Sequence, residues 1–318
     1  MRLNFKHTLY MINKTLLLSM LFFIIGCAKE EPKIQYGKNT FTTVVDGIER
    51  NYIVSVPQGY NGKTNVPVVF MLHGTGGDGN NVYNTSGWKE IGEQENILTV
   101  FPSGLVQCNI DDGVKSVSSK WNSQPTDNWS YCKNVTPPDD VKYFGKIIDE
   151  LMVKYSIDSK RIYFVGFSNG GQMCAKLSIF LSDRIAAIVE CSGSFNIDST
   201  LSWEPARKLP ITYQLGNKEG SFEVPLSQFQ MILNTPGFKP YIVQKTHVRL
   251  FDLNPNYTIS GDTNSVVLAE FIPLDGNVKN NFNFVFVKGL DHEYPNGVNH
   301  WMFGAQVHWN WLKQFTLP

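Results

Sequence analysis

The chain of 318 residues has little of several features that would narrow its class. Its longest apolar run, residues 16–25, is too short to cross the ~30 Å hydrocarbon core of a membrane. Lys and Arg equal Asp and Glu, 28 against 28, so no basic excess points to nucleic-acid binding. It has no internal repeat, and its only low-complexity tract is a short charged segment near the N-terminus, so we expect a globular domain.

The N-terminal segment has the layout of an export signal. Arg2, Lys6 and Lys14 precede the apolar run 16–25, which is typical of a signal peptide. The run ends in Ile-Ile-Gly followed by Cys27. This resembles the lipobox of bacterial lipoproteins, in which cleavage before the cysteine is followed by its acylation. The alternative is an ordinary signal peptide with an accidental cysteine.

We therefore expect residues 1–26 to be removed and residues 27–35 to be a lipidated cysteine with its tether. Residues 28–33 are mostly charged and resemble a surface-export signal, although any flexible linker has a similar composition. Loss of three positive charges from the original 28 leaves 25 basic against 28 acidic residues, a net charge near −3. The prediction is an exported protein anchored by lipid to a bacterial membrane, with the outer membrane and the cell surface both open.

Buried strands alternate with helices along the rest of the chain. Apolar residues alternate or cluster over residues 52–56, which indicates a strand. Continuously apolar segments indicate parallel strands that are covered on both faces; they are residues 67–72, 97–101, 161–165, 185–191 and 211–215. Helical periodicity marks residues 139–155, 170–181 and 298–315. Such alternation predicts an α/β fold with a mostly parallel central sheet and helices on both faces.

Two stretches depart from this alternation. Residues 105–137 are polar and read as a long loop, which in such folds usually shapes a binding site. Residues 221–280 are atypical, with expected strands at 241–251 and 265–272 as an insertion or extra edge strands. A further strand at 282–287 should belong to the main sheet. We expect one domain over residues 36–318.

A nucleophile is predicted at Ser168. Residues 166–171 read Gly-Phe-Ser-Asn-Gly-Gly, between a predicted strand and a predicted helix. A catalytic serine on such a sharp strand-to-helix turn needs small neighbours, because the turn is strained. The order strand, Gly-x-Ser-x-Gly, helix predicts the α/β-hydrolase fold.

Two backbone amides are predicted to stabilise an oxyanion. Acyl transfer places negative charge on the carbonyl oxygen, which preorganised amides must meet. In the hydrolase arrangement one amide follows the nucleophile, here Asn169, and one comes from an earlier loop. The segment His-Gly-Thr-Gly-Gly at 73–77 supplies Thr75, with Gly76 as the alternative. His73 lies upstream of the serine and is expected to be structural.

The base is predicted to be His292. It follows the expected strand 282–287 and precedes the last helix, which is where this fold delivers its histidine. His300 is the fallback. His247 falls in an expected strand and His308 in an aromatic-rich helix, so both should be packing or surface residues.

The acid is predicted to be Glu219. Chain order places it after the strand at 211–215, and Glu219 is the carboxylate in the turn that follows. It would fix the tautomer of the imidazole and stabilise the imidazolium. Glu223 and Asp275 are the competitors.

The cysteines divide into two kinds. Cys108 and Cys132 flank a polar stretch, and outside the cytosol such a pair can oxidise, so we predict a disulfide between them. Cys174 falls on an expected helix and Cys191 on a buried strand, where small buried thiols are the rule.

With these pieces in place, the chain resembles the secreted esterases that include feruloyl esterases, acetyl xylan esterases and polyhydroxybutyrate depolymerases. The resemblance rests on residues 52–56, 72–74, 139–141, 161–171 and 191–194, and on the loop with Trp121, Trp129 and Cys132. That family often shows His-Gly-x-x-Asp where residues 215–219 read Leu-Gly-Asn-Lys-Glu. Its Gly-x-x-His-x-Trp-Pro appears at 289–295 with Tyr294 in place of the tryptophan.

The leading hypothesis is a serine esterase that works through an acyl-enzyme on feruloyl or acetyl esters of plant polysaccharide, or on hydroxyalkanoate oligomers. Trp121 and Trp129, with Trp203, are candidates to stack on sugar or phenolic rings. No metal or organic cofactor is expected, and we expect a monomer. The alternatives are a serine peptidase of the same fold and an inactive hydrolase kept as a surface binding lipoprotein.

Overall fold

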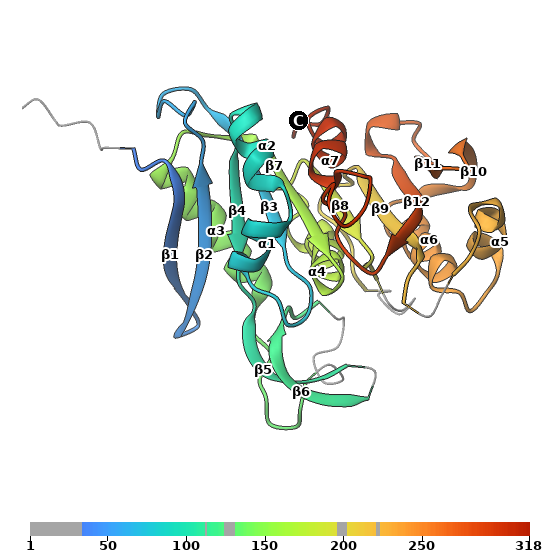
Figure 1. The fold of residues 1–318 in the computed structure, drawn as a ribbon, viewed down its shortest axis with the longest axis horizontal. Coiled ribbons are helices and arrows are strands. Elements are labelled where there is room, and N and C mark those ends of the chain that lie inside the picture. The colour runs from blue at the N-terminus through green and yellow to red at the C-terminus, as the bar shows by residue number, and fades with distance from the viewer. Residues whose placement is uncertain (1–33, 112, 124–130, 196–201, 221–222) are drawn as a thin grey trace, which may run out of the picture. The chain divides into compact units, whose positions relative to one another are not determined.

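The computed structural model describes residues 34–318 except 112, 124–130, 196–201 and 221–222. The expected signal peptide, Cys27 and nearly all of the tether lie outside the described residues. Residues from Gln35 to Pro318 form one compact unit (Figure 1). Over the described residues, no helix combines the length and apolar character needed to cross a membrane.

The described part of this unit is built on a ten-stranded sheet. Its six middle strands are parallel, and antiparallel strands flank them at both edges. In spatial order the strands are β1 (Gly37–Val45), β2 (Ile48–Val56), β4 (Leu98–Pro102), β3 (Val66–Leu72), β7 (Ile157–Phe167), β8 (Ala187–Cys191), β9 (Ile211–Lys218), β12 (Phe282–Asp291), β11 (Val266–Pro273) and β10 (Leu253–Asp262).

Helices cover both faces of the sheet (Figure 1). They are α1 (Gly79–Thr85), α2 (Trp88–Glu95), α3 (Asp140–Lys154), α4 (Asn169–Phe180), α5 (Phe229–Asn234), α6 (Lys239–Leu250) and α7 (Gly304–Leu312), with short 3-10 turns η1 (Leu226–Gln228) and η2 (Val278–Asn280). The predicted arrangement, a mostly parallel sheet between two helical layers, is confirmed.

The alternation of side chains along β3 explains the two layers. All seven residues of β3 are buried, because both faces of the strand are covered. Met71 belongs to a core that includes Trp88 of α2 and Trp309 of α7. Phe70 points the other way and packs on Phe144 of α3, with 6.4 Å between ring centroids.

Parallel strands end at one edge of the sheet, and three of these ends carry the predicted site. Ser168 follows β7, Glu219 follows β9 and His292 follows β12. Strand β12 pairs directly with β9, and β8 separates β9 from β7. The topology therefore brings residues that are far apart in sequence to neighbouring positions.

Helix α6 corrects the strand expected at residues 241–251. Pro240 stands in its first turn, and Val243, His247 and Leu250 recur at helical spacing on its buried side. His247 is therefore a buried helix residue rather than a strand residue. The expected strand at 265–272 is present as β11, and β10 extends the sheet beyond it.

Two further expectations were wrong at their boundaries. The helix expected at 298–315 spans only Gly304–Leu312, because residues 296–303 form a loop closed by a hydrogen bond from Gly297 to Met302. The loop expected at 105–137 contains a hairpin of β5 (Leu105–Asp111) and β6 (Val114–Lys120). Strand β6 is mostly polar and exposed, and the described side chains of β5 are mostly half-buried, so neither strand shows the regular apolar alternation that marks a strand in sequence.

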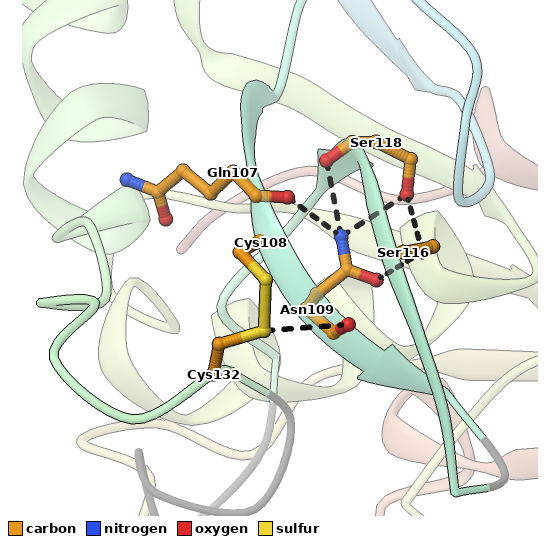
Figure 2. Close-up of a disulfide and its surroundings, with 6 residues drawn as sticks. All are labelled: Gln107, Cys108, Asn109, Ser116, Ser118 and Cys132. Atoms are coloured by element: carbon orange, nitrogen blue, oxygen red, sulfur yellow. Dashed lines mark hydrogen bonds between the residues drawn. A yellow bond between two sulfur atoms is a disulfide. The ribbon is translucent and has the colours of Figure 1, made fainter.

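The disulfide Cys108–Cys132 joins the predicted pair and ties β5 of the hairpin to the segment around Cys132 (Figure 2). Asn109 stabilises the hairpin from the inside. Its side-chain amide donates to the Ser118 hydroxyl at 3.0 Å, and its carbonyl oxygen accepts from Ser116 at 3.1 Å. The hydrogen bonds of Asn109 thus add to the backbone pairing of β5 with β6.

Candidate active site

Ser168 occupies a strained turn between β7 and α4. Its φ is +54°, in the left-handed region that favours glycine. A Cβ on Gly166 would lie 2.1 Å from the carbonyl oxygen of Gly170, and a Cβ on Gly170 would lie 2.5 Å from that of Leu72. Gly166 is thus required for the turn to close on itself and Gly170 for the turn to pack against β3. The turn presents the serine hydroxyl at the edge of the sheet.

His292 lies within hydrogen-bonding distance of both predicted partners. Its Nε2 is 2.9 Å from the Ser168 hydroxyl, and its Nδ1 is 2.6 Å from Oε2 of Glu219. An ionised carboxylate only accepts hydrogen bonds, so Nδ1 carries the proton that faces Glu219. Nε2 is then an acceptor, and the Ser168 hydroxyl donates to it. The three predicted residues form one hydrogen-bonded chain.

A second carboxylate braces this chain, and sequence reasoning missed it. Oδ1 of Asp291 accepts from the backbone amides of His292 at 2.6 Å and Gly220 at 3.0 Å. These two amide hydrogen bonds hold the pKa of Asp291 below its ordinary value. Asp291 thus ties the loop that carries the histidine to the turn that carries Glu219. Its position next to His292 was the available signal.

The competing acids have other partners. Glu223 pairs with Lys218 at 3.8 Å, with both side chains at least half exposed. Asp275 caps a turn by accepting from the amide of Asn277. Of the three candidate acids, only Glu219 has a described contact with His292.

The other histidines have structural contacts. His300 accepts the amide of Met302 and donates to the carbonyl of Lys288. His308 is buried between Tyr294 and Gln214, and burial lowers its pKa to about 3. The structure therefore assigns neither of them to the hydrogen-bonded chain of Ser168.

His247 forms a buried pair with a carboxylate. Its Nε2 lies 3.4 Å from Oε1 of Glu190, and its Nδ1 donates to the Val243 carbonyl at 2.8 Å. Its ring stacks on Phe282, with 4.1 Å between centroids. This histidine packs α6 against the sheet.

In the loop after β3, one of the two candidate oxyanion amides is already hydrogen-bonded within the protein. The amide of Gly76 donates to Ser119, so this alternative is already engaged. For the amides of Thr75 and Asn169, by contrast, no hydrogen bond to a described residue is found. Thr75 is exposed and Asn169 is the first residue of α4. These are the two amides predicted for an oxyanion.

His73 fixes this loop, as its predicted structural role requires. Its Nδ1 donates to the carbonyl of Gly74 at 2.7 Å, and its Nε2 accepts the amide of Gly104 at 2.9 Å. Burial lowers the pKa of His73 to about 4, so the ring is neutral at pH 7 and keeps this tautomer.

The sequence pattern of the phospholipase/carboxylesterase family matches residues 60–231, more than half of the chain and the part that holds Ser168. The chain belongs to this family. Membership groups it with carboxylesterase-type hydrolases.

Relatives of this carboxylesterase-family chain include feruloyl and acetylxylan esterases. Feruloyl esterase B of Piromyces equi is 28% identical over 174 residues, 54% of this chain and 29% of that protein. Feruloyl esterase D of Neurospora crassa is 24% identical over 214 residues, 64% of each chain. A bifunctional acetylxylan esterase/xylanase of Neocallimastix patriciarum is 29% identical over 129 residues, 41% of this chain and 16% of that protein. The matched part of the chain thus spans less than two thirds of the length of each of these relatives. The predicted resemblance to feruloyl and acetyl xylan esterases is confirmed.

Solved structures show the same fold. An acetyl xylan esterase from Aspergillus awamori superposes with a TM-score of 0.59 at 13% identity, covering 86% of this chain and 99% of that one. An S-formylglutathione hydrolase from Agrobacterium tumefaciens gives 0.57 at 12% identity, covering 90% and 98%. At such low identity these likenesses establish the α/β-hydrolase fold alone.

A cavity of about 410 Å³ opens beside His292 of this carboxylesterase-family chain. Met71, Val82 and Phe167 give it an apolar side, and Asn81 and Glu293 are among its polar lining residues. The ring of Phe167 lies 5.1 Å from that of His292, so the cavity reaches the imidazole. Its volume lies in the range of roughly 300–1,000 Å³ that is usual for small-molecule sites, so it is large enough for a ring-sized group.

The predicted stacking role of Trp121 is wrong. Trp121 is 1% exposed, and its indole N–H donates to the carbonyl of His73 at 2.9 Å. Its backbone amide donates to the side-chain oxygen of Asn169, so Trp121 helps to hold the residue that follows Ser168 in place. Trp129 lies outside the described residues. Trp203 packs edge-on against Phe180 rather than standing free.

The two remaining cysteines are buried free thiols. Burial raises the pKa of both Cys174 and Cys191, which makes them unreactive. In the described part of the chain, no cluster of three His, Cys, Asp or Glu side chains is arranged to hold a metal.

Proposed function

We propose that this protein is a serine esterase that hydrolyses carboxylic esters through an acyl-enzyme. The observation that carries the proposal is the hydrogen-bonded chain from Ser168 through His292 to Glu219. It combines an activated hydroxyl, a base of defined tautomer and a carboxylate that orients the base. The same chain argues against an inactive binding protein, because each of its contacts is in place.

In the first step Nε2 of His292 takes the hydroxyl proton of Ser168, while the oxygen of Ser168 forms a bond to the carbonyl carbon of the ester. The electron pair of the C=O π bond moves to the carbonyl oxygen, where the amides of Thr75 and Asn169 donate to it. When the intermediate collapses, the C–O bond to the alcohol breaks and His292 returns the proton to the leaving oxygen. Ser168 then carries the acyl group.

In the second step water replaces the alcohol. His292 Nε2 takes a proton from a water molecule, whose oxygen attacks the acyl carbon. Collapse of this second intermediate breaks the bond to Ser168, and His292 gives the proton back to the serine oxygen. The products are a carboxylic acid and an alcohol, and one chain contains every group that these steps use, which supports a monomer as the working unit.

The proposed substrates are feruloyl or acetyl esters of plant polysaccharide, or hydroxyalkanoate oligomers. The cavity beside His292 supports a ring-sized acyl or alcohol group, with apolar contact from Val82 and Phe167 and polar contact from Asn81. The feruloyl and acetylxylan esterases among the relatives support the first two classes.

Labelling with a fluorophosphonate tests the nucleophile. We expect the wild-type protein to be labelled and Ser168→Ala to remain unlabelled. Ser194→Ala, which removes another buried hydroxyl from the same unit, should label like the wild type. An unlabelled wild type would instead favour the binding protein.

Rates on chosen substrates test the reaction class and the acyl group. p-Nitrophenyl acetate should turn over faster than a peptide anilide, and the reverse order would favour a peptidase. Methyl ferulate, acetylated xylan and hydroxybutyrate oligomers, compared at equal ester concentration, then rank the proposed substrates.

We also propose export and lipid anchoring through Cys27, on the strength of the Ile-Ile-Gly-Cys segment. Expression in a bacterium fed radiolabelled palmitate should label the wild-type chain in the membrane fraction. Cys27→Ser should lose the label, and equal labelling of both would refute the anchor.

A further inference from the structure

The oxygen of Glu219 that faces away from His292 has its own partners. Oε1 accepts from the Ser192 hydroxyl at 2.5 Å and from the amide of Gly216 at 3.3 Å. A carboxylate has no proton to give, so the serine hydroxyl is the donor. Hydrogen bonds to a charged acceptor are short and stronger than those between neutral groups.

Ser192 is built into the fold at an unusual position. It follows β8, it is 3% exposed, and its φ is +52°, which a residue with a side chain rarely adopts. Its amide donates to the carbonyl of Gln214 on β9 at 2.8 Å, which fixes its backbone beside the strand that leads to Glu219. Glycine would adopt this backbone with less strain, and what serine adds here is the hydroxyl.

The same short segment also contacts the nucleophile. The carbonyl of Cys191 accepts the amide of Ser168 at 2.8 Å. A Cβ on Gly193 would lie 1.8 Å from the carbonyl oxygen of Ser168, so the backbones are in direct contact there. Residues 191–193 therefore connect the serine to the acid by a route that does not pass through His292.

We propose that Ser192 is a positioning residue that holds the carboxylate of Glu219 toward His292. The inference rests on the proposed esterase function. Glutamate has one more rotatable bond than aspartate, so its carboxylate swings more freely unless both oxygens are held. His292 holds Oε2, and the Ser192 hydroxyl holds Oε1. The hydroxyl has no described contact with Ser168 or His292, and acts only through the acid.

Two substitutions remove the hydroxyl in different ways. Ser192→Ala keeps the Cβ, whereas Ser192→Gly also relieves the backbone. We expect both to lower kcat on p-nitrophenyl acetate roughly 10- to 100-fold, the range for losing a hydrogen bond to a charged group. KM should change less than about twofold, because Ser192 is buried and does not line the cavity beside His292.

Stability separates this role from a structural one. Ser192→Gly should melt at a higher temperature than Ser192→Ala, because both lose the hydroxyl but glycine suits a φ of +52°. Ser194→Ala is the matched control: Ser194 is 1% exposed, and its hydroxyl has no hydrogen-bond partner among the described residues. It should keep the wild-type kcat.

A double-mutant cycle identifies the route. In a Glu219→Ala background, Ser192→Gly should change kcat less than about twofold, since the group it acts through is gone. A full 10-fold or larger loss in that background would overturn the proposal, as would wild-type kcat in Ser192→Gly. If the wild type itself lacks Ser168-dependent activity, the proposed esterase function fails first, and that outcome is distinct from either of these.

Discussion

Replacement of Arg50 by Met should destabilise the domain strongly, because it leaves a buried carboxylate without its cation. Arg50 Nη2 lies 2.6 Å from Oδ1 of Asp140, and the side chains are 1% and 0% exposed. The other oxygen, Oδ2, accepts the amide of Asn122 at 2.7 Å. Met keeps the apolar stem of Arg50 and removes its charge, its hydrogen bonds and the contact of its guanidinium with the ring of Tyr143.

The expected loss is about 3–5 kcal/mol in the free energy of unfolding, as is usual when one partner of a buried ion pair is removed. That is a large part of the ~5–15 kcal/mol that stabilises a typical domain. Asp140→Asn should also destabilise, since it leaves the guanidinium unpaired. The double variant should lose less than the sum of the two single losses, because neither charge is then stranded.

The loss should also depend on pH. Burial raises the pKa of Asp140, and the charge of Arg50 is the main opposing influence. Without Arg50 the pKa rises further. Between the ordinary carboxyl value and this raised value the native state binds more protons than the unfolded state, so stability falls as pH rises. Arg50→Met should therefore lose more stability at pH 8 than at pH 5.

Urea denaturation followed by tryptophan fluorescence at the two pH values measures both effects. The matched control is Arg161→Met, whose pair with Asp158 has the same 2.6 Å separation but side chains 40% and 28% exposed. It should cost less than about 1 kcal/mol. The reasoning would be refuted if Arg50→Met matched this control, or if its loss were equal at both pH values.

Three further predictions concern the site and its support. Glu219→Gln should lower kcat on p-nitrophenyl acetate about 10²- to 10⁴-fold while the protein still folds, and an unchanged rate would remove Glu219 as the acid. Burial lowers the pKa of His308 to about 3, so below pH 6.5 the native state binds fewer protons than the unfolded state, and stability falls as pH drops. His308→Gln should flatten this dependence of stability on pH, measured by urea denaturation at several acid pH values. An unaltered slope would contradict the lowered pKa of His308. Replacing Cys108 and Cys132 by Ser opens a link between residues 24 apart and should cost up to about 3 kcal/mol, seen as a lower melting temperature that reductant no longer affects; a wild-type melting curve would argue against that contribution.

Much of the fold followed from local patterns. Strands such as β3 and β8 are buried on both faces, so each appears in the sequence as an apolar run that predicts a strand without knowledge of its neighbours in the sheet. Helix α6 was misread because its apolar side chains cluster closely enough to suggest a strand. The β5–β6 hairpin was missed because β6 is mostly polar and exposed, while Asn109 contacts both Ser116 and Ser118 of that strand. Side-chain contacts of this kind between two strands produce no periodic pattern of apolar residues in the sequence.

The sequence by itself identified Ser168 as the candidate nucleophile, because the turn that carries such a serine needs glycine neighbours whatever surrounds it. The order of the residues along the chain likewise identified His292 as the candidate base. Only the tertiary structure shows which of Glu219, Glu223 and Asp275 lies against the imidazole of His292. It is Glu219, because residues 73 positions apart meet only when β9 and β12 pair. The tertiary structure also decided that Trp121 is a buried support, since burial depends on which distant elements pack over a side chain.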